Sequence, residues 1–176
     1  GSAYLQVVQG QKNGSPPRCD LEVAKTLHTT LIGLIQSGLV KSAHDCSEGG
    51  LAVALAESCI SQLLARETPR LIGATVDLSG VGQASRLSQT KIEKVPDGDR
   101  RDALLFGEAQ SRVVITCKPL EAVKVVERAK LMGVPAARIG TVGGDQLRIK
   151  TRAGEFSAPL TELHDAWWNS IAKAMS

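Results

Sequence analysis

Apolar and polar residues follow one another along this chain in blocks that predict alternating strands and helices. The most regular block runs from Asp20 to about Ser37, where apolar residues recur every three or four positions. This spacing is typical of an amphipathic helix, with Asp20 as a good N-cap and Gly38 as its stop. One face of this helix carries Ala24, Leu27, Leu31, Leu34 and Ile35.

The remaining elements follow from shorter apolar runs between turn residues. Strands are expected over residues 3–9, 39–44, 71–76, 113–117, 137–142 and 146–150, the last two joined as a hairpin by Gly143-Gly144-Asp145. Helices are expected over residues 49–63, from Pro119 to Gly133, and from Pro159 past Ile171, the last with Leu160, Leu163, Trp167 and Ile171 on one face. Residues 79–99 are expected to form a loop. The predicted fold class is α/β (mixed α+β), a mixed sheet covered by helices.

The junction between the second predicted strand and the helix that follows it carries most of the candidate chemistry. Residues 42–57 read Ser-Ala-His-Asp-Cys-Ser-Glu-Gly-Gly-Leu-Ala-Val-Ala-Leu-Ala-Glu. The first N–H groups of a helix lack internal partners and its dipole favours anions, so the turn is a candidate phosphate site. Asp45 offers a carboxylate to a metal ion and Ser47 a hydroxyl to a phosphate. The alternative is that Ser47 only caps the helix, while Gly49 and Gly50 relieve a tight turn.

Composition indicates an ordinary globular domain. The chain has 176 residues, of which 43% are hydrophobic, 22% charged and only 3% aromatic, so its core must rest on Leu, Val, Ile and Ala. A net charge of +3 and the lack of an aromatic-plus-basic stripe give no argument for nucleic acid. The sequence holds no apolar run of 18 residues and no signal-peptide pattern, so we expect neither a membrane segment nor secretion.

Four cysteines occur without a C-x-x-C pair, which indicates reduced thiols in a cytosolic protein rather than a zinc site. Cys46 is the exception of interest, because the neighbouring helix terminus could lower the pKa of its thiol. His44, two residues away, would share its face on a strand and could act as its base. A Cys46–His44 catalytic pair is therefore the minor alternative at this turn.

Five collinear segments give the chain a family resemblance. They are residues 1–5 (Gly-Ser-Ala-Tyr-Leu), 16–21 (Pro-Pro-Arg-Cys-Asp-Leu), 42–57, 104–112 (Leu-Leu-Phe-Gly-Glu-Ala-Gln-Ser-Arg) and 139–145 (Ile-Gly-Thr-Val-Gly-Gly-Asp). Together they resemble the C-terminal domain of the phosphoribosylformylglycinamidine synthase (FGAM synthase) family, the ATP-dependent amidotransferases of purine biosynthesis. The domain type is shared with aminoimidazole ribonucleotide (AIR) synthetase and a few related ATP-using enzymes. An AIR-synthetase C-terminal-domain-like fold is the expectation that follows.

The resemblance implies that residues 1–176 are a single domain of a longer synthase. In that family three other domains precede this one, and the ATP and substrate sites lie between domains of two duplicated halves. The whole enzyme converts formylglycinamide ribonucleotide to formylglycinamidine ribonucleotide with ATP and glutamine-derived ammonia. This chain would then form one wall of a cleft, carry no catalytic residue of its own and be inactive alone.

Two groups of site residues follow from the resemblance. The Asp45-Cys46-Ser47 element resembles one that, in long family members, holds Mg²⁺ and an auxiliary ATP or ADP. Asp45 is therefore the candidate metal ligand, and Ser47 with the backbone of Gly49 and Gly50 the candidate nucleotide site. In short members the same residues can be purely structural, and the sequence of this chain is closer to that of the short form.

The second group is Glu108, Gln110 and Arg112, whose counterpart in the family's first half binds the ribonucleotide substrate. Here they would be a vestigial copy. The alternative is that these polar residues cap a strand and pair locally.

The expected partners also come from the resemblance. They are the remaining synthase domains and, for a short form, a separate glutaminase subunit and a small bridging subunit, all in the cytoplasm. Two alternatives for function stay open. The chain is a non-catalytic structural or partner-docking half of the duplicated synthase, or it is part of a related ATP-using member of the same superfamily.

Overall fold

The structure is a computed structural model that describes residues 2–12, 16–17, 19–60, 71–81 and 101–176. Its contacts divide the chain into two units, and each is described by itself. Unit 1 comprises Gly1–Ala54 and Val81–Arg138, and unit 2 comprises Leu55–Gly80 and Ile139–Ser176. All the candidate site residues belong to unit 1.

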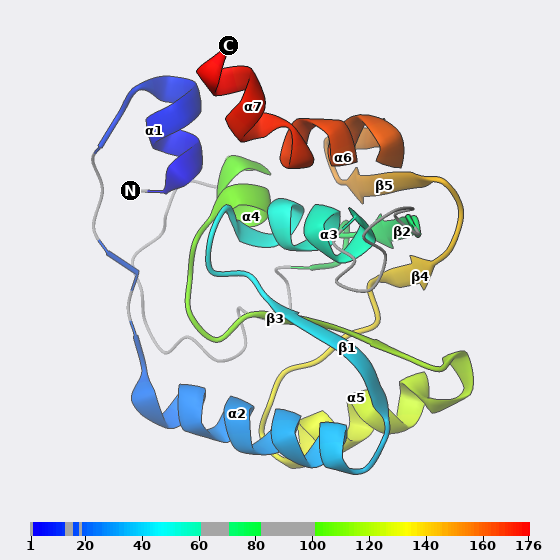
Figure 1. The fold of residues 1–176 in the computed structure, drawn as a ribbon. Coiled ribbons are helices and arrows are strands. Elements are labelled where there is room, and N and C mark those ends of the chain that lie inside the picture. The colour runs from blue at the N-terminus through cyan, green and yellow to red at the C-terminus, as the bar shows by residue number, and fades with distance from the viewer. Residues whose placement is uncertain (1, 13–15, 18, 61–70, 82–100) are drawn as a thin grey trace. The chain divides into compact units, whose positions relative to one another are not determined.

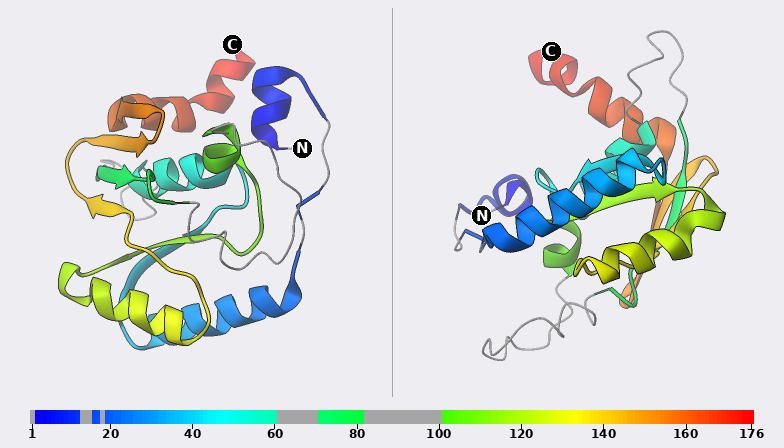
Figure 2. Two further views of the ribbon diagram at one scale, coloured as in Figure 1. Left: turned by 180° about the vertical axis from the view of Figure 1, so that it is seen from behind. Right: turned by 90° about the horizontal axis from the view of Figure 1, so that it is seen from below.

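Unit 1 is built on an antiparallel strand pair, β1 (Val40–Asp45) with β3 (Val113–Cys117), in which Asp45 lies opposite Val113. Helices α2 (Leu21–Gln36) and α5 (Ala122–Leu131) lie along this pair (Figures 1 and 2). Leu34, Leu39 and Val125 form a buried cluster there, against which side chains of both strands pack. The unit also contains α1 (Ala3–Gln9), α4 (Arg101–Phe106) and a 3-10 turn, Pro119–Glu121.

The helix predicted after Asp20 is confirmed. An Asp20 carboxylate oxygen accepts hydrogen bonds from the amides of Glu22 and Val23, at 3.1 and 3.2 Å, and so satisfies two free donors of the first turn. Past the last turn, Gly38 has a φ of 72°, a left-handed conformation that glycine adopts without strain. The strands β1 and β3 and the helix after Pro119 are confirmed as well.

The prediction of a strand over residues 3–9 is wrong, because this segment is helix α1. A short apolar run fits both periodicities, and the deciding contacts are capping and packing. The Ser2 hydroxyl accepts from the Leu5 amide at 3.4 Å, and Gly10 closes the helix at a φ of 64°. The ring of Tyr4 stacks on Phe106 of α4, with centroids 4.6 Å apart.

Helix α3 (Gly50–Ile60) follows β1 through the glycine turn, as predicted, and residues 61–63 of the expected helix lie outside the described residues. Leu51 and Leu55 are each 5% exposed. Their spacing of four residues places them on one face, so the predicted buried face of this helix is confirmed.

Unit 2 is a four-stranded mixed sheet in the order β4-β2-β5-β6. Its strands are β2 (Ala74–Asp77), β4 (Gly140–Val142), β5 (Gln146–Thr151) and β6 (Gly154–Pro159), followed by helices α6 (Leu160–Trp168) and α7 (Ser170–Met175). Strands β2 and β5 run parallel, and the other pairs are antiparallel. Val76, Leu147, Ile149 and Leu160 are among its buried side chains. With its helices and mixed sheet, the structure confirms the predicted fold class.

The hairpin predicted around Gly143 and Gly144 is wrong. Strand β2 lies between β4 and β5, and it bonds to both. The chain before β2 also bonds to the turn itself, since the Gly73 amide donates to the Gly144 carbonyl at 2.9 Å and the Gly143 amide to the Gly73 carbonyl at 2.7 Å. The hairpin of this unit is instead β5–β6. The second strand reads Gly-Glu-Phe-Ser-Ala-Pro, which lacks the β-branched residues that mark a strand in the sequence.

Smaller corrections concern element ends. Strand β2 begins at Ala74 rather than Leu71, because the Ile72 amide donates to the Cys59 carbonyl outside the sheet. The last predicted helix is divided into α6 and α7 at Asn169. The predicted loop of residues 79–99 lies almost wholly outside the described residues. Within the described part of the chain, no helix combines the length and apolar character needed to cross a bilayer.

Candidate functional site

Asp45 and Ser47 sit where β1 leads into the turn before α3. Asp45 is the last residue of β1, and its side chain is 64% exposed. The Ser47 hydroxyl donates to the Asp45 carboxylate. This hydrogen bond is the largest of the influences that hold the pKa of Asp45 below its ordinary value. The turn therefore presents an ionised, solvent-facing carboxylate.

The alternative interpretation of Ser47 as the N-cap of α3 is wrong. Helix α3 begins at Gly50, three residues after Ser47, so Ser47 does not directly precede the helix as an N-cap must. The Ser47 hydroxyl donates to Asp45. The turn itself depends on glycine, because Gly49 and Gly50 have φ values of 70° and 74°. An added Cβ on Gly50 would lie 2.8 Å from backbone atoms of Phe106, so a larger residue here would force one of the two segments to shift.

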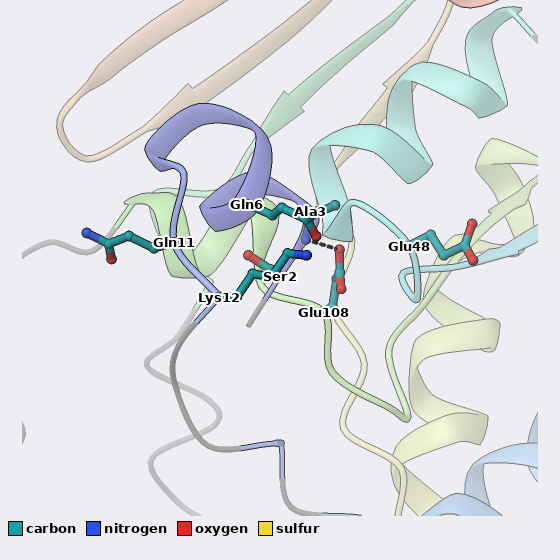
Figure 3. A pocket seen from close by; sticks show the side chains of 7 residues that line it. All are labelled: Ser2, Ala3, Gln6, Gln11, Lys12, Glu48 and Glu108. Atoms are coloured by element: carbon teal, nitrogen blue, oxygen red, sulfur yellow. Dashed lines mark hydrogen bonds between the residues drawn. The ribbon is translucent and has the colours of Figure 1, made fainter.

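Glu108 lies beside the same turn. Its Oε1 atom accepts a hydrogen bond from the Gly49 amide at 3.0 Å and another from the Ala3 amide at 2.9 Å. Figure 3 shows this side chain directed at the start of α1. The Gly49 amide was predicted to bind a phosphate. In the structure it donates instead to the Glu108 carboxylate of the same chain.

Arg112 also binds backbone. Its two terminal nitrogens donate to the carbonyls of Gly107 and Leu104, both at 3.1 Å, at the end of α4. Gln110, between Glu108 and Arg112, is exposed. The structure thus brings Glu108 to the glycine turn and turns Arg112 towards α4, a pattern that favours local pairing over a shared substrate site.

An open pocket of about 480 Å³ lies between the start of α1 and the glycine turn (Figure 3). Its lining consists of Ser2, Ala3, Gln6, Gln11, Lys12, Glu48 and Glu108. The contribution of α1 was missed from the sequence, because residues 3–9 were expected to form a strand. Ser2, a good N-cap residue just before the segment, is the signal that could have revealed the helix.

The expectation of a lowered pKa for the Cys46 thiol is wrong. Cys46 is 2% exposed, and burial, the main influence, raises its pKa. The imidazole of His44 makes a hydrogen bond through Nδ1 with the Asp45 carbonyl at 2.7 Å. A buried thiol with a raised pKa is a poor nucleophile. The turn therefore offers no support for a Cys46–His44 pair.

The chemistry of Asp45 is compatible with a magnesium ion that takes most of its ligands from elsewhere. Among the described residues, no group of three or more His, Cys, Asp or Glu side chains could hold a metal by itself. Mg²⁺ commonly takes one or two protein carboxylates and fills its remaining positions with water and phosphate oxygens. An exposed, ionised carboxylate at the end of a strand meets this requirement, with the Ser47 hydroxyl as its neighbour.

Known proteins resemble this chain along its length. "Phosphoribosylformylglycinamidine synthase subunit PurL" of Anaeromyxobacter dehalogenans (strain 2CP-C) is 39% identical over 173 residues, which are 97% of this chain and 20% of the relative. The chain therefore spans about a fifth of the length of the curated relatives it matches. The resemblance to the FGAM synthase family drawn from the sequence is confirmed.

Solved structures confirm the fold. "T. maritima PurL complexed with FGAR" matches with a TM-score of 0.63 at 22% identity, over 89% of this chain and 23% of that chain. "Structure of PurLQS from Thermotoga maritima" matches with a TM-score of 0.62 at 22% identity, over 85% of this chain and 23% of that one. T. maritima PurL structures complexed with ATP and with ADP match with a TM-score of 0.56 at 22% identity, over 80% of this chain and 21% of theirs.

The family itself is given by residues 1–151, which match the description "AIR synthase related protein, C-terminal domain". This match covers β1, the glycine turn, α3, and the loop that carries Glu108 and Arg112. The chain therefore belongs to the family of AIR synthase related C-terminal domains.

Proposed function

We propose that this chain is the C-terminal domain of an ATP-dependent FGAM synthase of the PurL type. The whole protein converts formylglycinamide ribonucleotide to the amidine with glutamine-derived ammonia, and residues 1–176 form one domain of it. The observation that carries the proposal is the 39% identity to a PurL subunit over 97% of this chain. The matched stretch includes the strand–turn–helix junction with the exposed Asp45.

Within this function, the Asp45 turn is the proposed Mg²⁺-nucleotide site. Asp45 holds Mg²⁺, which neutralises phosphate charge when it is bound. Ser47 would supply its hydroxyl to a phosphate in place of its hydrogen bond to Asp45. The backbone of Gly50 is buried in this structure and would take part only after it is uncovered. Support comes from the exposure of Asp45, its lowered pKa and the PurL structures named as complexed with ATP and ADP. The Gly49 amide can bind a phosphate only after its hydrogen bond to Glu108 is broken.

The substrate-binding role for Glu108, Gln110 and Arg112 has weaker support. Glu108 and Arg112 both bond to backbone groups of this chain. We therefore assign this loop a supporting role around the turn, as a vestigial copy would have.

The proposed partners are the remaining domains of the synthase, a glutaminase subunit and a small bridging subunit. Their support is the T. maritima structure named PurLQS, whose PurL-like fold this chain shares. The proposed location is the cytoplasm. The second candidate function, a structural half without ligand, is favoured by the occupation of the Gly49 amide by Glu108.

A domain exchange tests the proposed function. The stretch of A. dehalogenans PurL that matches this chain is replaced by residues 1–176, and the purified chimera is assayed for FGAM formation with ATP and ammonia. We expect turnover by the chimera, and none by the isolated chain or by the relative without its own matching stretch. A chimera that melts cooperatively but turns over no more substrate than the truncated relative would contradict the proposal.

A further inference from the structure

We propose that Glu108 is a positioning residue that couples the N-terminal helix α1 to the glycine turn before α3. One oxygen, Oε1, accepts from the Ala3 amide at 2.9 Å and from the Gly49 amide at 3.0 Å. These two donors are 105 and 59 residues from Glu108 in the sequence, so the carboxylate joins three distant segments at one atom. The inference does not depend on the proposed nucleotide site.

The same three segments meet a second time beside this carboxylate. The Tyr4 ring of α1 stacks on the Phe106 ring at an interplanar angle of 7°. The backbone of Phe106 in turn packs so closely on Gly50 that a Cβ there would lie 2.8 Å away. Phe106 therefore contacts α1 with its ring and the turn with its backbone, two residues before Glu108. The Tyr4–Phe106 stack therefore holds α1 beside the loop that carries Glu108.

The loop that carries Glu108 is itself fixed. Arg112 donates to the carbonyls of Leu104 and Gly107, both at 3.1 Å, and the Gly107 amide donates to the Ala103 carbonyl at 3.2 Å. Hydrogen bonds thus hold the backbone on both sides of Glu108 in place. Its carboxylate can keep both hydrogen bonds only while the Ala3 and Gly49 amides stay close together. If α1 moves, one of the two hydrogen bonds must lengthen.

Helix α1 depends on this docking. It has only seven residues, and a helix of that length is unstable in water without tertiary contacts. Its Ala3 amide is one of the first-turn donors that have no partner inside the helix, and Glu108 supplies the acceptor. Helix α1 is therefore ordered by the same carboxylate that holds the Gly49 amide, and the two should respond together.

Amide hydrogen exchange, measured by NMR on the ¹⁵N-labelled 176-residue chain, tests the coupling. In Glu108→Ala the Gly49 amide should exchange about ten-fold faster or more, because a charged acceptor is lost. Glu108→Gln keeps an oxygen in place and should restore most of the protection. Glu48→Ala removes a neighbouring exposed carboxylate of the same turn and should leave the protection factor of the Gly49 amide unchanged. The amide of Ala129, in the buried part of α5, serves as the reference for global unfolding.

The decisive variant is Tyr4→Ala, which removes the stack on Phe106 but touches neither hydrogen bond. We expect it to speed exchange at Gly49 at least three-fold in the presence of Glu108, and to add nothing in Glu108→Ala. Equal exchange at Gly49 with and without Tyr4 would overturn the proposal. So would a loss of protection at Ala129 as large as that at Gly49, or a failure of Glu108→Gln to rescue.

Discussion

The Ser47 hydroxyl donates a hydrogen bond to the carboxylate of Asp45, two residues earlier in the chain. This bond holds the carboxylate in its charged form at the exposed end of β1, and it is the main reason for the lowered pKa of Asp45. Ser47 thereby acts on the electrostatics of the turn rather than on the first turn of α3.

Ser47→Ala should raise the pKa of Asp45 towards the ordinary aspartate value. The folded chain holds this carboxylate ionised more readily than the unfolded chain does, so its stabilising contribution is present at neutral pH. That contribution is lost as the pH falls through the folded-state pKa, and the loss should be smaller in the variant. A ¹³C carboxyl titration of Asp45 measures the shift, and an unchanged midpoint would show that Ser47 is not its cause.

Gly50→Ala should destabilise the chain far more than Gly133→Ala. Both glycines have positive φ, 74° and 81°, so both substitutions carry the left-handed penalty of roughly 1–2 kcal/mol. Only at Gly50 would the added Cβ meet the Phe106 backbone, whereas at Gly133 it meets nothing within 4 Å. Urea unfolding should therefore give about 2–5 kcal/mol for Gly50→Ala. Equal losses for the two variants would contradict the close approach of α4 to the turn.

Leu55→Ala should lower the free energy of unfolding by about 2–5 kcal/mol, because it leaves a cavity where a buried side chain was packed. Leu55 is 5% exposed, whereas Leu120 is 95% exposed and provides the matched control. Leu120→Ala should change stability by less than about 0.5 kcal/mol. The comparison is made by urea denaturation, and a loss at Leu55 no larger than that at Leu120 would place this face of α3 outward.

Cys46 should resist alkylation in the folded chain. It is 2% exposed and burial raises its thiol pKa, whereas Cys19 is exposed. Iodoacetamide at neutral pH followed by peptide mapping should label Cys19 in the native chain and Cys46 only after addition of urea. Labelling of Cys46 at the same rate as Cys19 in the native chain would show that Cys46 is accessible and reactive.

The elements predicted correctly are those whose signals are local. Asp20 caps α2 through amides two and three residues away, so the sequence alone reveals the helix start. Residues 3–9 lack such decisive periodicity, and their helix is fixed by contacts with Phe106 and Glu108, about a hundred residues further along. The misassigned hairpin has the same origin, because a strand from an earlier part of the chain, β2, inserts beside β5.

The candidate site, like the fold, combines features set by neighbouring residues with features that depend on distant ones. The exposed position of Asp45 agrees with its predicted place at the mouth of the strand–turn–helix junction. The hydrogen bond from Ser47 to its carboxylate was not predicted, because Ser47 was expected to bind a phosphate or to cap the helix. The bond between the Gly49 amide and Glu108 spans 59 residues, and no spacing pattern announces it. Glu108 and Arg112 form one predicted group in the sequence, whereas the fold directs Glu108 to the glycine turn and Arg112 to the end of α4.

The most direct test of the proposed site at Asp45 is the stabilisation of the 176-residue chain by Mg-ADP. At about 100 times the dissociation constant, the nucleotide should add about 2.7 kcal/mol to the free energy of unfolding. The gain should require Mg²⁺, vanish in Asp45→Asn and persist in Glu48→Gln, which removes a second exposed carboxylate from the same turn. A gain that survives in Asp45→Asn, or one that needs no Mg²⁺, would contradict the assignment of Asp45.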